Sequence, residues 1–254
     1  GTTGSIHTDG GLGVAGTAFV AGAATVGGAS QFNSTVTVGV NDTGYDVKLF
    51  GATAGKYALW DESADSWIIS GTQSTVTAGT SNYIAGVNAG NSIASGGNYN
   101  VTIGDEAGTA ITTGDNNVAV GYAAGDAITT GIQHTLIGSG AGGALTSGLT
   151  LTAVGFNAGT NVTTGNANIL IGAIAGDAIT TGANNVAIGD SALGAVTTSS
   201  NNTAVGMNSG FTLTSGSQNV FAGVNAGRLQ TTGVNCVAVG FHALYANTSG
   251  DSNV

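Results

Sequence analysis

Proline, cysteine and basic residues are almost absent from this chain. Its 254 residues include no proline, one cysteine and three basic residues, against 13 acidic ones. The resulting net charge of −10 argues against partners such as nucleic acid or an anionic membrane surface. A single cysteine excludes an intrachain disulfide framework, and no run of roughly 20 apolar residues is present that could cross a membrane. Charged residues are only 6% of the chain, yet a hydrophobic content of 41% is not typical of disorder.

Glycine, by contrast, is abundant and regularly spaced. The 46 glycines include a series, here called the coil glycines, that recurs with a 17-residue period after a first step that is longer by one. The extra residue of that first step falls in the Gly-Gly of residues 96–100. The series is Gly86, Gly104, Gly121, Gly138, Gly155, Gly172, Gly189, Gly206, Gly223 and Gly240. A fixed period of this length predicts a repeat architecture in which each copy stacks on the next.

Each copy predicts a short strand that ends at its coil glycine. The residues one and three positions before that glycine are mostly β-branched and share one face of a strand. The residue between them, such as Ala119 or Leu136, faces the other way and is also apolar, so both faces are suited to burial. The second half of a copy reads Ile-Thr-Thr-Gly, as in residues 128–131. We interpret one copy as strand, turn, strand, turn, which is one coil of an all-β, parallel β-solenoid.

An asparagine row lies four positions before the coil glycine and predicts a polar ladder of hydrogen-bonded amides from coil to coil. Its members are Asn82, Asn100, Asn117, Asn168, Asn185, Asn202 and Asn219. His134 and Cys236 occupy the same row, so we interpret them as replacements in the ladder rather than as catalytic groups.

The β-branched rows predict an apolar seam along the solenoid. The residues expected to form it are Val118, Val120, Ile137, Val154, Ile171, Ile188, Val205 and Val239. Because so short a coil encloses a thin interior, a single chain has too little material to cover both faces. We therefore expect a homo-oligomer whose chains lie side by side around a common axis.

Three regions are expected along the chain. Residues 1–40 are rich in glycine and alanine and predict an irregular β fibre segment. Residues 41–81 hold both tryptophans and a predicted hairpin, with Asp46–Phe50 as a further strand, and form a small β-module followed by a connector. Residues 82–254 are the β-solenoid of ten 17-residue repeats. Asn253 and Val254 match the start of another copy, so we expect a longer parent protein.

The copies NNVAVGYAAGDAITTG (residues 116–131) and NNVAIGDSALGAVTTS (residues 184–199) resemble the repeats of phage tail fibres. They are also similar to the head repeats of trimeric autotransporter adhesins, which form a left-handed parallel β-roll. Residues 39–69 are similar to segments in structural proteins of marine phages such as cyanophages. The resemblance implies a homotrimeric fibre shaft on the virion, partnered by itself and by other virion proteins, that presents tips to a host glycan or protein receptor. A bacterial surface adhesin is the alternative.

Nothing in the sequence predicts an enzyme, a cofactor or a metal site. Glycoside hydrolysis needs two carboxylates about 5–9.5 Å apart, whereas Asp126 and Asp177 lie three coils, or roughly 14 Å, apart. His7 lies alone in a glycine-rich segment, and His242 occupies an offset that holds asparagine in other copies, so we interpret both as polar residues without a catalytic role. Paired threonines such as Thr129-Thr130 suggest ice binding as a third alternative, but strand alternation would let only one threonine of each pair face outward.

Overall fold

The computed structural model describes residues 78–254 and, before them, the three strands at residues 47–50, 57–61 and 66–70. The chain divides into two units, Gly1–Gly71 and Thr72–Val254. In the first unit, β1 (Val47–Phe50), β2 (Tyr57–Asp61) and β3 (Ser66–Ser70) form an antiparallel sheet in the order β1-β2-β3. The predicted fibre segment at residues 1–40 lies outside the described residues.

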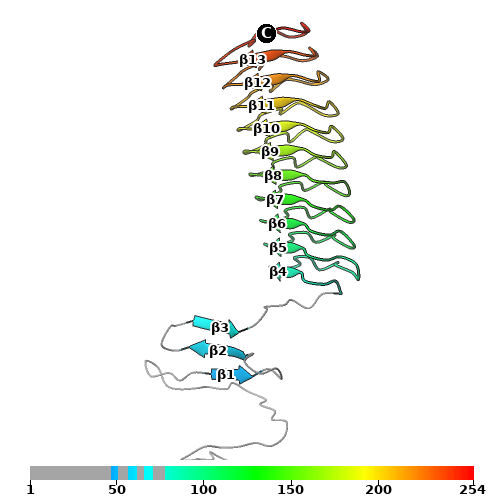
Figure 1. Cartoon of the computed structure of the whole chain (residues 1–254), viewed down its shortest axis with the longest axis vertical. Helices are drawn as coiled ribbons and strands as arrows, with labels where there is room; N and C mark the ends of the chain where they lie inside the picture. Colours follow the sequence, from blue (N-terminus) through cyan, green and yellow to red (C-terminus); the bar gives the residue numbers. More distant parts are fainter. Residues whose placement is uncertain (1–46, 51–56, 62–65, 71–77) are drawn as a thin grey trace, which may run out of the picture. The chain divides into compact units, whose positions relative to one another are not determined.

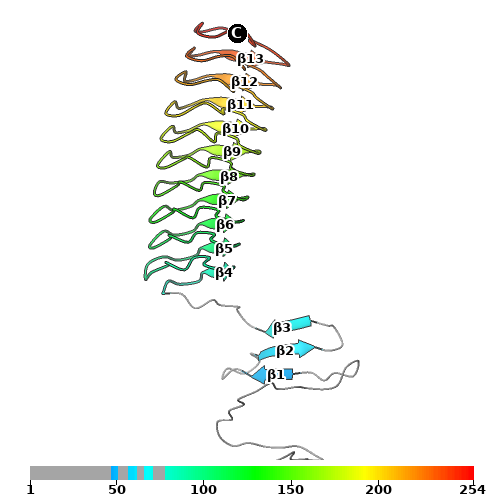
Figure 2. The same ribbon diagram turned by 180° about the vertical axis from the view of Figure 1, so that it is seen from behind.

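The second unit is a parallel β-solenoid, as the glycine period predicts. Figures 1 and 2 show its strands stacked one above another, and they form a ten-stranded parallel sheet in sequence order. The strands are β4 (Tyr83–Ala85), β5 (Val101–Ile103), β6 (Val118–Val120), β7 (Thr135–Ile137), β8 (Thr152–Val154), β9 (Ile169–Ile171), β10 (Val186–Ile188), β11 (Thr203–Val205), β12 (Val220–Ala222) and β13 (Val237–Val239). No helix occurs among the described residues.

Strand register confirms the glycine period. Val118 on β6 pairs with Thr135 on β7, and every later strand pair keeps the same sequence offset. The first pair, Tyr83 with Val101, has an offset longer by one. The Ala94 amide donates to the Thr112 carbonyl, so the two residues still have the longer offset of the first strand pair. The Asn98 amide donates to the Asp115 carboxylate, and these two residues are 17 positions apart, as in all later coils. The inserted residue therefore lies between Ala94 and Asn98.

The prediction of two strands per coil is wrong for residues 78–254. Each coil contains one short strand, and the Ile-Thr-Thr-Gly segment is a series of bends and turns. Neighbouring segments are nevertheless joined by backbone hydrogen bonds, such as Thr129 N–H to the Thr146 carbonyl at 2.8 Å and Thr180 N–H to the Thr197 carbonyl at 2.8 Å, and in some coils a second amide donates to the same carbonyl, as Gly182 N–H does to Thr197 at 3.4 Å. The second side of the coil is thus held by isolated bonds rather than by a strand ladder.

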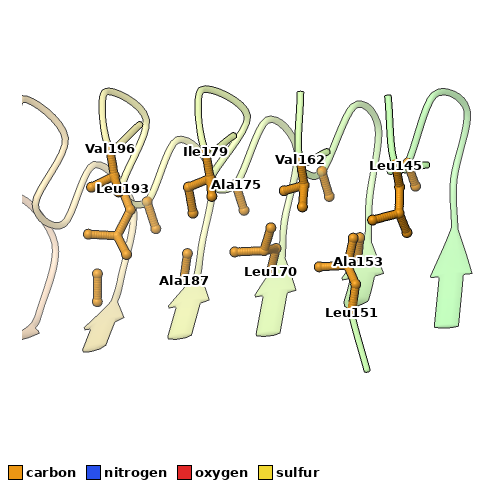
Figure 3. Close-up of a cluster of buried hydrophobic side chains, with 14 of the residues drawn as sticks. Leu145, Leu151, Ala153, Val162, Leu170, Ala175, Ile179, Ala187, Leu193 and Val196 are labelled. Atoms are coloured by element: carbon orange, nitrogen blue, oxygen red, sulfur yellow. The ribbon is translucent and has the colours of Figure 1, made fainter. Parts of the chain in front are cut away.

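The core fills the narrow space between the strand and the turn segment of each coil. Figure 3 shows strand residues such as Leu170 and Ala187 pointing toward turn residues such as Val162 and Ile179. These side chains are fully buried and belong to one cluster that extends from coil to coil. These side chains fill the interior, and the residues on the outer face of the sheet lie at the surface of the single chain.

The coil glycines are required by stacking as well as by turning. Gly189 has φ +132°, a conformation that residues with a side chain rarely adopt. A Cβ atom built there would stand 2.6 Å from the carbonyl carbon of Gly206 in the next coil. The repeated glycine therefore marks a point where successive backbones approach closely.

Candidate functional site

The outer face of the ten-stranded sheet is apolar and uncovered in the single chain. We define the outer sheet face by the first and third residue of each strand from β4 to β13. Of the predicted seam residues, Val118, Val120 and Val154 are half-buried, and Ile137, Ile171, Ile188, Val205 and Val239 are exposed. The middle residue of each strand from β5 to β13 is instead buried inside the coil.

No charged residue occurs at any position of the outer sheet face. Of the described residues, the exposed large hydrophobic ones fall on this face, on its continuation at Val254 or directly after a coil glycine, with Tyr99 and Leu149 as exceptions. Ten strands at strand spacing make the face roughly 45 Å long. Parallel sheets are normally covered on both faces, and apolar patches of this length mark interaction surfaces.

The predicted polar ladder lies inside the coils. Asn100, Asn117, Asn168, Asn185, Asn202 and Asn219 are all buried, with exposures of 0–1%. At a typical rung, the Oδ1 atom of Asn185 accepts hydrogen bonds from the backbone and side-chain amides of Asn202, at 3.0 and 3.3 Å. The Nδ2 atom of Asn185 donates to the Ser199 carbonyl at 2.9 Å. Each amide thus closes the turn of its own coil and anchors the strand of the next.

His134 and Leu151 take the place of asparagine in two successive coils of the polar ladder. His134 is buried, and its Nδ1 atom accepts a hydrogen bond from the Leu151 amide at 3.1 Å, in place of an asparagine oxygen. Its Nε2 atom has no partner at full hydrogen-bond geometry, although the Gly148 backbone is near enough to favour the charged ring. Burial lowers the pKa of His134 from 6.5 to about 4, opposed by the Gly148 backbone. The bonding pattern requires the neutral ring, so His134 is a ladder member, and Leu151, which the sequence analysis did not include in the row, breaks the ladder.

Cys236 continues the row as a buried free thiol. Its backbone amide donates to Asn219 Oδ1 at 2.9 Å, and its sulfur atom lies 3.1 Å from the Gly250 carbonyl oxygen. The thiol therefore replaces the asparagine Nδ2 group, which donates to the equivalent turn carbonyl in other coils.

Both threonines of the Thr-Thr pairs reach the surface, contrary to the expectation from strand alternation. In the pairs at residues 129–130 and 180–181, the first threonine is half-buried and the second is exposed. The segment is a turn, so alternation does not apply to it. The first hydroxyl is engaged, because Thr129 Oγ1 donates to the Thr146 carbonyl at 3.0 Å and Thr180 Oγ1 to the Thr197 carbonyl at 3.1 Å.

A cationic and aromatic cluster occupies the C-terminal coils. Phe211, Arg228 and Tyr245 share one offset from their coil glycines, and Arg228 Nη1 donates to Tyr245 Oη at 3.0 Å. His242 stacks on Tyr245 with ring centroids 4.6 Å apart, and Phe241 stacks on His242 at 4.0 Å. The sequence pattern predicts only a polar replacement at His242, in the position of asparagine in other coils. The regular spacing of Phe211, Arg228 and Tyr245 is the signal that could have revealed the cluster.

The acidic residues do not form a metal centre in the part of the chain that the structure describes, where no group of three His, Cys, Asp or Glu side chains could hold an ion. Burial raises the pKa of Asp126 and of Asp177, and backbone hydrogen bonds to each carboxylate oppose the shift. No helix among the described residues is long and apolar enough to span a membrane.

Comparison with known proteins gives no relative for this chain. No family model matches it, and neither the curated proteins nor the solved structures contain a match. The fold and the surface features above are therefore the basis for any functional conclusion.

Proposed function

We propose that this chain forms the structural shaft of a homotrimeric phage tail fibre and holds receptor-binding tips away from the virion. The observation that carries the proposal is the uncharged, apolar outer sheet face, which runs the length of the solenoid. A second copy of the chain presents an identical face in the same register, so side-by-side assembly covers every coil at once. The number three and the virion location come from the resemblance of the repeats to those of phage tail fibres.

The shaft function is mechanical. Strand hydrogen bonds join successive coils, and the buried asparagine ladder, except at its break at Leu151, and most of the Thr-Thr backbone bonds add connections at other places around the circumference. Lys48, Lys56 and Arg228 are the chain's only sites for trypsin-like cleavage. A rod with these properties resists bending and proteolysis, which a fibre outside a cell requires.

Immunogold electron microscopy tests this function. Antibodies raised against residues 78–254 are expected to label the thin fibres of phage particles along their length, below the tips. Label on bacterial surfaces in particle-free cultures would contradict the shaft function and favour the surface adhesin.

One observation favours the ice-binding alternative. The second threonine of a pair is exposed, and its hydroxyl makes no hydrogen bond within the described residues, as at Thr130 and Thr181. The first hydroxyl is occupied by the next coil, so only one row of free hydroxyls faces water. A thermal-hysteresis measurement on the purified chain decides the question, and we expect no hysteresis because a single row is too narrow to match a lattice.

A further inference from the structure

The three strands of the first unit divide their residues between two unlike faces. Val47 on β1, Trp60 on β2 and Trp67 on β3 lie opposite one another in the sheet. Alternate residues of a strand lie on the same face, so this register assigns every strand residue to one face or the other. One face, here called the tryptophan face, is formed by Val47, Leu49, Ala58, Trp60, Trp67 and Ile69.

The tryptophan face is wholly apolar. The opposite face holds the charged residues Lys48 and Asp61 and the serines at both ends of β3. An antiparallel sheet divided in this way normally packs its apolar face against another layer and leaves the other face in water. The strands described in this unit all belong to one layer, so they provide no second layer to cover it. The tryptophan face therefore needs a cover from elsewhere.

Two features favour other copies of this chain as the cover. Residues 71–77 are all that separates β3 from the described part of the solenoid unit. Assembly through the outer sheet face would therefore hold the small sheets of different copies at a high effective concentration. The tryptophan face also carries no charge that would repel an identical face. In a symmetric assembly the same patch on each copy can cover the patch on its neighbours.

We propose that the tryptophan face packs against the tryptophan faces of other copies of the chain. The proposal rests on the shaft function, because the outer sheet face is what brings the copies together. Each copy contributes only six apolar residues to the contact, so we expect it to form within the assembly and not between separate chains. The small sheets then give the copies a second contact, apart from the solenoid in sequence.

Tryptophan fluorescence of the whole chain reports on this face alone, because Trp60 and Trp67 are the chain's only tryptophans. The native assembly should emit at short wavelength and resist quenching by acrylamide, since a covered face excludes water and quencher. Ile188→Asp, which separates the copies at the outer sheet face, should shift the emission to longer wavelength and increase the quenching several-fold.

Ile69 and Ile68 provide a matched pair of positions on β3. Ile69 lies on the tryptophan face and Ile68 on the opposite face, so the same substitution tests each face in turn. Ile69→Asp should shift the emission to longer wavelength, while native mass spectrometry still finds the native number of copies, held by the outer sheet face. Ile68→Asp should leave both the emission and the mass unchanged.

The contrary results separate this proposal from the shaft function. Long-wavelength emission from a native assembly of several copies would overturn the proposal and leave the shaft function standing. Short-wavelength emission that persists in an Ile188→Asp monomer would also overturn it, because the cover would then come from the same chain. Equal shifts in Ile68→Asp and Ile69→Asp would contradict the assignment of faces. A native chain with the mass of one copy would refute the shaft function and this proposal together.

Discussion

Replacing His134 with asparagine is expected to remove an acid-sensitive point from the solenoid. In the native chain the neutral ring accepts the Leu151 amide, and its Nε2 atom is buried without a partner. In the equivalent rung, Asn117 Nδ2 donates to the Gly131 carbonyl at 2.9 Å, so an asparagine at position 134 should reach Gly148 in the same way. The variant keeps the acceptor for Leu151 and has no group that titrates.

The magnitude follows from the pKa of His134. Its folded-state value of about 4 is below the ordinary 6.5, so the unfolded chain takes up the proton first. The stability contributed by the neutral ring is complete above pH 6.5 and is lost as the pH falls to about 4. At about 1.4 kcal/mol for each pH unit between those values, the loss is about 3 kcal/mol per chain. Asp126 and Asp177, whose pKa values are raised, change stability in the opposite direction but equally in both proteins.

Guanidinium unfolding followed by circular dichroism at several pH values between 7.5 and 4 provides the assay. The advantage of His134→Asn over the native chain should grow by about 3 kcal/mol across that range. A His134→Leu control also cannot titrate, but it leaves the Leu151 amide unpaired. It should therefore be less stable than His134→Asn by about 1–3 kcal/mol at every pH. Parallel loss of stability in the native chain and His134→Asn would refute the reasoning, because it would mean that His134 is not held neutral by burial.

Two further substitutions test the stacking of coils. Asn185→Ala removes the acceptor of the Asn202 amide and the donor to the Ser199 carbonyl. Two buried groups left unpaired should lower the unfolding free energy by about 2–6 kcal/mol. Asn184→Gly, at an exposed position with φ 57°, is the matched control and should change the unfolding free energy little. Gly189→Ala should prevent native stacking, because its Cβ would stand 2.6 Å from the next backbone at φ +132°, and limited proteolysis that finds this variant as resistant as the native chain would contradict the argument.

The sequence predicts the solenoid because its strongest constraints recur at fixed offsets. Gly189 must be glycine to let the next coil approach, and the inward position of Leu170 must be apolar. The same residue types therefore recur in the sequence once per coil. Strand alternation correctly separates Leu170 from its neighbours Ile169 and Ile171, which face outward. These local rules suffice for the period, the parallel sheet and the uncovered apolar face.

The same rules fail outside the strand for a physical reason. Residues such as Asn116 and Ala123 have positive φ values of 59° and 50°, and each such residue turns the chain so that alternation no longer assigns faces. The second predicted strand was wrong because the Ile-Thr-Thr-Gly segment is bent rather than extended, so alternation does not decide which threonine of each pair faces outward. The cluster around Arg228 was missed because its members were considered singly rather than at a shared offset.

The mass of the native assembly tests the central claim most directly. Native mass spectrometry of the purified chain, with light scattering at several concentrations, should give three copies of the 24.3 kDa chain. Ile188→Asp, which places a charge on the outer sheet face, should reduce the mass to that of one chain, while Thr181→Asp on the exposed threonine row should leave it unchanged. A native chain that stays monomeric at all concentrations, with the outer sheet face in water, would contradict the account.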